Sequence, residues 1–231
     1  MLTDMHTSGG YVHTTSAAVE AGDITWTRPV TFNELVPRYH PPAANDNAAR
    51  PRVIGLTGFG GSGKSEVAKY LAGIGYTRTH IKDPLRRMAA SLLDDAGHSP
   101  EEIDSYLDGE LKREVIPRLR RTGTEIQMFL GTEFGRDFCY PGLWLDMWRA
   151  RAAAILGDGG KVTQESVRFP NEADAIRDLG GLVVRVERPG VGPLSDHVSE
   201  RPPCEPDFTI RNNGSIAQLH AQIATWLRHA A

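Results

Sequence analysis

The sequence predicts an α/β fold in which helices cover both faces of a parallel sheet. From Arg52 onward, short apolar runs alternate with amphipathic segments of helical length. The first run, Val53–Thr57, is typical of a strand that is buried on both faces. With 231 residues, of which 40% are hydrophobic, the chain is long enough for one such domain with appendages.

Four further apolar or alternating segments complete the expected sheet of five parallel strands. With Val53–Thr57, the strands are expected at residues 76–81, 161–166, 182–187 and 208–210. A helix should follow the first strand from about Gly63, and residues 83–157 should be mostly helical. Another helix should run from about Pro170 to the glycines at 180 and 181.

Helix starts are marked by capping residues. Ser99 with Glu102 and Ser215 with Gln218 have the spacing of capping boxes, in which side chain and backbone satisfy each other's hydrogen bonds. Asp83 directly before Pro84 is expected to cap a third helix.

Residues 1–50 differ in composition from the rest. They are rich in Thr, Ala, Pro and Asn, and we expect an extension with a linker before a main domain at 51–231. The alternating segment Ile24–Thr27 leaves partial docking of the extension open.

Composition disfavours several classes of function. The net charge of -3 offers no general attraction for a nucleic acid polymer. Cys139 and Cys204 have no His or Cys neighbours at metal-ligand spacing, so neither a disulfide framework nor a zinc site is indicated. No apolar stretch has the length of a signal peptide or a membrane helix, and a soluble cytoplasmic protein is expected.

The loop after the first strand matches the phosphate-binding pattern G-x-x-x-x-G-K-[ST] at every defined position. Its glycines allow successive N–H groups to turn toward one point, and the following helix adds the positive end of its dipole. A glycine-rich turn without a ligand is the plain alternative, but an exposed lysine and four glycines are a poor choice for stability alone. The expected ATP-binding residues here are Gly58, Phe59, Gly60, Gly61, Ser62, Gly63, Lys64, Ser65 and Glu66.

Several later segments, in their order and spacing, resemble one family. They are residues 83–90, 127–136, 167–173, 186–190, 197–200 and 213–215. On these residues, 52–229 resemble the bacteriophage deoxynucleoside monophosphate kinases and, more distantly, dephospho-CoA kinase. The resemblance implies a three-layer P-loop kinase fold with a helical acceptor-binding insertion at 83–157, a lid at 188–206, ATP as phosphoryl donor and Mg²⁺ as cofactor.

The resemblance also implies residues that touch the acceptor or the transferred phosphate. The acceptor-binding candidates are Asp83, Arg87, Gln127, Glu133, Arg136, Arg168 and Glu172. The catalytic candidates are Lys64, Arg136, Arg168 and Arg188. Plain alternatives stay open: Asp83 as a helix cap, Arg136 in a surface salt bridge, and Arg188 or Arg201 in a solvated loop instead of a closing lid. His197 and Glu200 complete the lid pattern, and a loop histidine is more often structural.

The magnesium site is the point where the sequence departs from the family pattern. An acidic residue usually stands directly before the segment Val167–Phe169, but this chain has Ser166 there and Glu165 one position earlier. The metal candidates are therefore Ser65 and Glu165, although neighbouring strand residues face opposite ways. The turn at Asn213 resembles the loop that borders adenine, and it is equally well explained as a turn before a helix.

The predicted function is ATP-dependent phosphorylation of a nucleoside or deoxynucleoside monophosphate to the diphosphate. Another small-molecule P-loop kinase, such as dephospho-CoA kinase, is the enzymatic alternative. A regulatory ATP-binding module that uses the N-terminal extension is the non-enzymatic one. The expected partners are ATP and the monophosphate, with no nucleic acid polymer and no membrane. A homodimer stays open, and the compartment would be the host cytoplasm if a phage encodes the chain.

Overall fold

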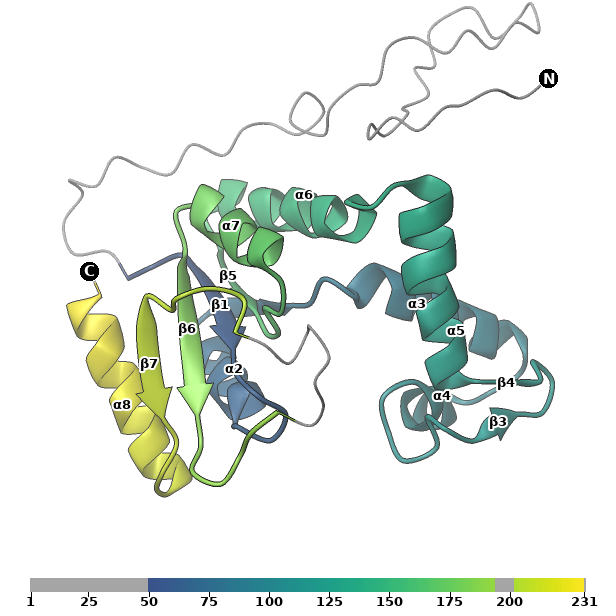
Figure 1. Cartoon of the computed structure of the whole chain (residues 1–231), viewed down its shortest axis with the longest axis horizontal. Coiled ribbons are helices and arrows are strands. Elements are labelled where there is room, and N and C mark those ends of the chain that lie inside the picture. Colours follow the sequence, from purple (N-terminus) through teal and green to yellow (C-terminus); the bar gives the residue numbers. More distant parts are fainter. Residues whose placement is uncertain (1–49, 194–201, 231) are drawn as a thin grey trace, which may run out of the picture. The chain divides into compact units, whose positions relative to one another are not determined.

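A computed structural model describes residues 50–193 and 202–230 (Figure 1). They fall into two compact units. The sheet unit comprises the described residues of 50–81 and 147–230, and the helical unit comprises Lys82–Asp146. The predicted N-terminal extension and the lid residues His197, Glu200 and Arg201 lie outside the described residues.

The sheet unit is built on five parallel strands in the order β2-β5-β1-β6-β7. The predicted five-stranded parallel sheet is therefore confirmed. The strands are β1 (Val53–Thr57), β2 (Tyr76–Thr79), β5 (Lys161–Gln164), β6 (Leu182–Glu187) and β7 (Phe208–Arg211). Two strands end two residues earlier than expected, since the chain turns away after Thr79 and after Gln164.

Helices cover both faces of this sheet. On one face, α2 (Lys64–Gly73) and α8 (Ile216–His229) pack on β1, β6 and β7 through a buried cluster that includes Ile54, Leu56 and Val184. On the other face, α7 (Pro170–Asp178) approaches β1 so closely that a side chain at Gly55 would meet Val167 and Ile176 at under 3 Å. Figure 1 shows these helices around the sheet.

The helical unit has its own core. Its elements are α3 (Asp83–Asp95), α4 (Pro100–Leu107), β3 (Val115–Ile116), β4 (Arg121–Thr122), α5 (Gly123–Phe129) and the π-helix η2 (Leu130–Cys139). Buried side chains from α3, α4, β3 and α5 meet at Leu93, Ile103, Ile116 and Ile126. A further helix, α6 (Leu143–Gly157), begins in this unit and continues in the sheet unit.

Two features of the helical unit were not expected from the sequence. The hairpin of β3 and β4 is too short to produce an alternating pattern. The π-helix brings Gly135 against Trp144, where a Cβ atom would lie 2.3 Å from the indole nitrogen. That nitrogen donates a hydrogen bond to the carbonyl of Gly131 at 2.9 Å. The π-helix thus packs closely against Trp144 of the next helix, a contact that local sequence patterns do not reveal.

The capping predictions have mixed outcomes. Capping boxes at Ser99 and Ser215 are confirmed. The prediction for Asp83 is wrong by one position, because Lys82 is the N-cap of α3 and Asp83 is already helical.

No helix of the described residues is long and apolar enough to cross a membrane.

Candidate nucleotide-binding site

The phosphate-binding loop connects β1 to α2, as its sequence requires. Gly58, Gly61 and Gly63 all have positive φ angles, of 132°, 79° and 104°. A Cβ atom at Gly58 would lie 2.3 Å from the carbonyl oxygen of Val186, and one at Gly63 would lie 2.4 Å from the amide nitrogen of Asn212. Only glycine fits at these two positions, so the loop has the backbone form in which N–H groups can face a bound phosphate.

Lys64, the first residue of α2, extends back along the loop. Its ammonium nitrogen donates to the carbonyl oxygens of Gly58 at 2.7 Å and Phe59 at 2.8 Å. The charge therefore lies against the loop itself, where it can reach the phosphates of a nucleotide held by the same loop. Ser65 follows at the exposed start of the helix.

Glu66 occupies the first turn of α2 but is engaged elsewhere. Its carboxylate accepts a hydrogen bond from Lys69 at 2.7 Å, and this bond lowers the pKa of Glu66 below its ordinary value. Both side chains of the pair are well exposed. The side chain of Glu66 is thus explained by a helix-surface ion pair, and any contact with ATP stays a prediction.

Asn212 belongs to the turn that was predicted to border adenine, but its contact with the phosphate-binding loop was not predicted. Its side-chain nitrogen donates to the carbonyl oxygen of Ser62 at 2.9 Å, and its backbone nitrogen donates to the carbonyl oxygen of Glu187 at 2.7 Å. The end of β7 is thereby fastened to the loop. The sequence feature that could have indicated this role is an asparagine directly after the last strand. The neighbouring Asn213, which was predicted to border adenine, has no role that the structure tests.

The residues at the end of β5 contact protein groups. Glu165 makes a two-pronged salt bridge with Arg78 of β2, with N–O distances of 2.6 and 2.8 Å, and this hydrogen bonding raises the pKa of Arg78. Gln164 is buried, and its side chain exchanges hydrogen bonds with the backbone of Ser166. Among the described residues there is no cluster of three or more His, Cys, Asp or Glu that could hold a metal.

Arg168 and Glu172 lie where β5 connects to α7. The Glu172 carboxylate accepts hydrogen bonds from the backbone nitrogens of Arg168 at 2.7 Å and Phe169 at 3.4 Å, so it caps α7. The side chain of Arg168 is exposed, and its Nε donates to the Ser166 hydroxyl at 3.0 Å. Arg168 was predicted as a phosphate ligand and has an accessible guanidinium. For Glu172 the structure shows a helix-capping role.

A hollow in the sheet unit joins the phosphate-binding loop to Arg168. Its lining comes from the loop, from the β5–α7 connection, from the end of β6 and from the chain before β7. The lining residues are Thr57, Gly58, Phe59, Gly60, Val167, Arg168, Arg185, Val186, Glu187 and Pro202. The fold therefore brings a predicted phosphate-binding arginine beside the loop from 110 residues away in the sequence. Arg188, another catalytic candidate, comes directly after the lining residue Glu187 and is exposed.

The remaining candidates belong to the helical unit. Asp83 and Arg87 lie on α3, and Glu133 and the exposed Arg136 lie on η2. Gln127 of α5 donates to the carbonyl oxygen of Leu107 at 2.6 Å, which explains the residue structurally. Gln127 also lines a hollow of this unit. The other lining residues of that hollow are Lys82, Leu85, Leu107, Asp108, Lys112, Thr124 and Met128.

Asp108, beside this second hollow, is the centre of a charged network. It pairs with Arg86 at 2.5 Å and with Lys82 at 3.1 Å, and Arg86 also pairs with Asp104 at 2.5 Å. Burial acts to raise the pKa of Asp108, but the hydrogen bonds and charges of Arg86 and Lys82 outweigh it, and the pKa lies below its ordinary value of 3.8. The folded state thus favours the ionised form.

We expect the Asp108→Asn variant to unfold at lower urea concentration than the wild type at neutral pH. The loss should be about 1 kcal/mol, because these ion pairs are partly exposed and solvent screens them. A depressed pKa contributes stability that is lost as the pH falls, so the difference should shrink below pH 3.8. Asp104→Asn is the control. Because the Asp104 side chain is 75% exposed, this variant should lose less free energy of unfolding. A loss that does not change with pH would contradict this account.

Comparisons with known proteins give one sequence relative and several solved structures. No family model matches the chain. A protein of Acanthamoeba polyphaga mimivirus named "Putative deoxynucleotide monophosphate kinase" is 28% identical over 195 residues, which cover 78% of this chain and 97% of that protein.

Solved structures give weaker likenesses. A sugar kinase from Janibacter has a TM-score of 0.41 at 19% identity, covering 77% of this chain and 94% of that chain. A Thermus thermophilus protein has a TM-score of 0.45 at 19% identity, and the match covers 79% of this chain and 99% of that chain. A dephospho-CoA kinase from Campylobacter jejuni has a TM-score of 0.42 at 14% identity, and the match covers 78% of this chain and 96% of that chain. By its 28% identity the chain is a distant homologue of the viral protein, and it has a complete phosphate-binding loop pattern on a parallel α/β sheet.

Proposed function

We propose that the chain transfers the terminal phosphoryl group of ATP to the phosphate of a nucleoside or deoxynucleoside monophosphate. The observation that carries the proposal is the complete phosphate-binding loop whose hollow also contains the exposed Arg168. The name of the viral relative supports a deoxynucleotide as the acceptor. The products are ADP and a nucleoside diphosphate.

The reaction is an in-line displacement at phosphorus. An oxygen of the acceptor phosphate forms a bond to the γ-phosphorus, and the bond from that phosphorus to the β-γ bridging oxygen breaks, so that the electron pair leaves with ADP. No covalent enzyme intermediate is required, and catalysis consists of positioning and electrostatic stabilisation. Lys64 and Arg168 supply positive charge on the sheet unit, and Arg188 is a third candidate.

The proposed magnesium ion would be held chiefly by Ser65 and by oxygen atoms of the nucleotide. Ser65 occupies the serine position of the loop pattern, and its hydroxyl is at the exposed start of α2. Mg²⁺ would neutralise charge on the phosphates. Glu165 stays a second candidate, but it would have to give up its salt bridge with Arg78.

We propose Arg136 of η2 as a ligand of the acceptor phosphate, because its guanidinium is exposed and can hold two phosphate oxygens at once. Arg136→Ala should raise the KM for the acceptor by about tenfold or more and leave the KM for ATP nearly unchanged. Arg113→Ala is the matched control, since Arg113 is an exposed arginine of the same unit. Equal KM values for the acceptor in wild type and Arg136→Ala would remove Arg136 from the proposal. The same measurement on Asp83→Asn, Arg87→Ala and Glu133→Gln tests three further acceptor candidates of this unit.

The function is tested by ADP release measured across all common nucleoside and deoxynucleoside monophosphates and dephospho-CoA. Strong stimulation by one monophosphate, with the matching diphosphate as product, is the expected result. Stimulation by dephospho-CoA alone would replace the acceptor class. ATP binding without stimulation by any acceptor would favour a regulatory module and overturn the proposal.

A further inference from the structure

A second arginine, Arg185, lines the hollow beside the phosphate-binding loop. Arg185 lies on β6 in register with Thr57, the residue directly before the loop. Its neighbours Val184 and Val186 point into the core beneath α2 and α8. Since strand residues alternate, Arg185 points to the opposite face, where α7 lies. The side chain is 23% exposed and forms part of the hollow together with Arg168.

Among residues 50–193 and 202–230, the guanidinium of Arg185 has only weak contacts. Its Nη2 donates to the carbonyl oxygen of Cys204 at 3.4 Å, and its Nη1 lies 3.9 Å from the Glu187 carboxylate. Both distances are near the upper limit for their kind of contact. A guanidinium has five N–H donors, and removing it from water is costly when they are poorly satisfied. The observed contacts therefore do not account for a half-buried arginine at this place.

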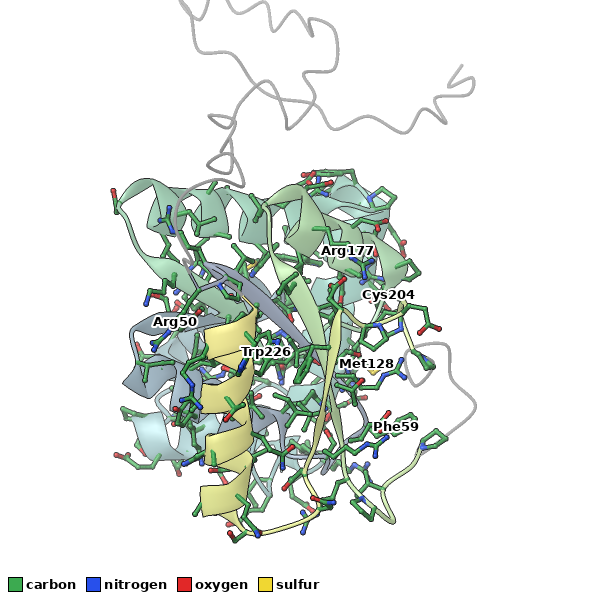
Figure 2. The ribbon with its side chains drawn as sticks, turned by 90° about the vertical axis from the view of Figure 1, so that its left-hand side faces the viewer. Arg50, Phe59, Met128, Arg177, Cys204 and Trp226 are labelled. Atoms are coloured by element: carbon green, nitrogen blue, oxygen red, sulfur yellow. The ribbon has the colours of Figure 1, made fainter. Side chains whose placement is uncertain are left out.

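Two other arginines of the sheet unit show what a structural role looks like. Arg52 donates to the carbonyl oxygens of Leu156 at 2.6 Å and Gly160 at 2.8 Å. Arg177 donates to the carbonyl oxygen of Glu205 at 2.8 Å and lies next to Cys204 (Figure 2). The segment before β7 is thus already fastened by Arg177, and Arg185 adds only the longer contact.

The chemistry of the hollow indicates an anion. Arg168 and Arg185 are both positive, and the loop residues Gly58, Phe59 and Gly60 line the same space. Among the described lining residues, Glu187 carries the one carboxylate, and its side chain is 49% exposed. Two guanidinium groups beside a phosphate-binding loop suit the oxygen atoms of a phosphoryl group.

We propose that Arg185 and Arg168 together bind a phosphoryl group in this hollow. The identity of the ligand rests on the proposed function: it is the phosphate of the acceptor or the γ-phosphate of ATP. Arg185 contacts the group directly, and Glu187 competes with the ligand for Arg185. Loss of Arg185 therefore weakens phosphate binding, and loss of the Glu187 charge strengthens it.

The test is a titration of inorganic phosphate into the full-length protein saturated with ADP, followed by the rise in Tm. ADP occupies the loop, so added phosphate reports on the hollow. Arg185→Met keeps the stem of the side chain and should weaken phosphate binding by about tenfold or more. Arg185→Lys should recover part of the loss, and Glu187→Gln should bind phosphate more tightly than the wild type. Arg228→Met, which removes an arginine near the end of α8, is the control and should change nothing.

Equal phosphate affinity in Arg185→Met and wild type would overturn the proposal. If Arg185→Met does not fold, unchanged affinity in both Arg185→Lys and Glu187→Gln would overturn it instead. The titration does not need turnover, so it remains decisive even if the proposed kinase activity fails. If the enzyme is active, a higher KM for the acceptor in Arg185→Met than in the wild type identifies the bound group as the acceptor phosphate. A weaker affinity of Arg185→Met for ATP, with unchanged affinity for ADP, identifies it as the γ-phosphate.

Discussion

Replacing Lys64 with alanine should lower kcat by about a thousandfold or more, because electrostatic stabilisation is the main catalytic contribution in phosphoryl transfer. The Lys64 ammonium donates to the loop carbonyl oxygens of Gly58 and Phe59 at 2.7 and 2.8 Å, so its charge lies against the loop. The truncation leaves the buried packing of α2 on the sheet in place.

The measurement is ADP release under saturating ATP and acceptor, together with thermal unfolding to show that the variant is folded. Lys69→Ala is the matched control, since Lys69 lies on the same helix and is 60% exposed. It should retain nearly full activity. A Lys64→Ala protein that forms ADP at the wild-type rate with an acceptor would contradict the proposed function.

The Gly58→Ala substitution should destabilise the sheet unit by about 3 kcal/mol or more, because two costs combine. The φ angle of 132° is strained for any residue with a side chain, and the new Cβ atom would lie 2.3 Å from the carbonyl oxygen of Val186. A backbone atom of β6 cannot move aside without disturbing the strand pairing of β1 and β6.

Gly61→Ala separates these two costs. Its φ angle is also positive, at 79°, but a Cβ atom there would meet nothing within 4 Å. Gly61→Ala should lower the free energy of unfolding by only about 1 kcal/mol, the usual cost of a left-handed conformation in a residue other than glycine. Urea unfolding of both variants provides the comparison. Equal losses would show that the close approach to β6 is unimportant.

Local patterns were sufficient for the sheet and for the loop. The strand Val53–Thr57 and the loop that follows were predicted at the right residues, since a continuous apolar run and a glycine pattern are properties of neighbouring positions. The capping boxes at Ser99 and Ser215 are local in the same way. The hairpin was missed because its strands are too short to produce an alternating pattern, and no local pattern indicated the π-helix or its close contact with Trp144.

The surroundings of the loop could not be predicted for a related reason. Arg185 reaches the hollow because β6 pairs with β1 in a particular register, with Arg185 opposite Thr57. Glu165 was considered as a metal ligand, and only the pairing of β2 with β5 brings Arg78 close enough to hold it. Such pairings join residues about 90 to 130 positions apart, and the hydrophobic pattern of one strand does not identify the strand that pairs with it.

The hydrogen bond from Asn212 to Ser62 makes the proposed nucleotide site dependent on β7, which is a terminal strand of the sheet among the described residues. Terminal strands open more readily than central ones, since they have one neighbour. Each opening of β7 would release the loop from Asn212 before the rest of the unit unfolds. A bound nucleotide should therefore slow hydrogen exchange in β7 and α8, beyond the residues it touches, and nucleotide occupancy would govern how long this part of the chain survives proteolysis.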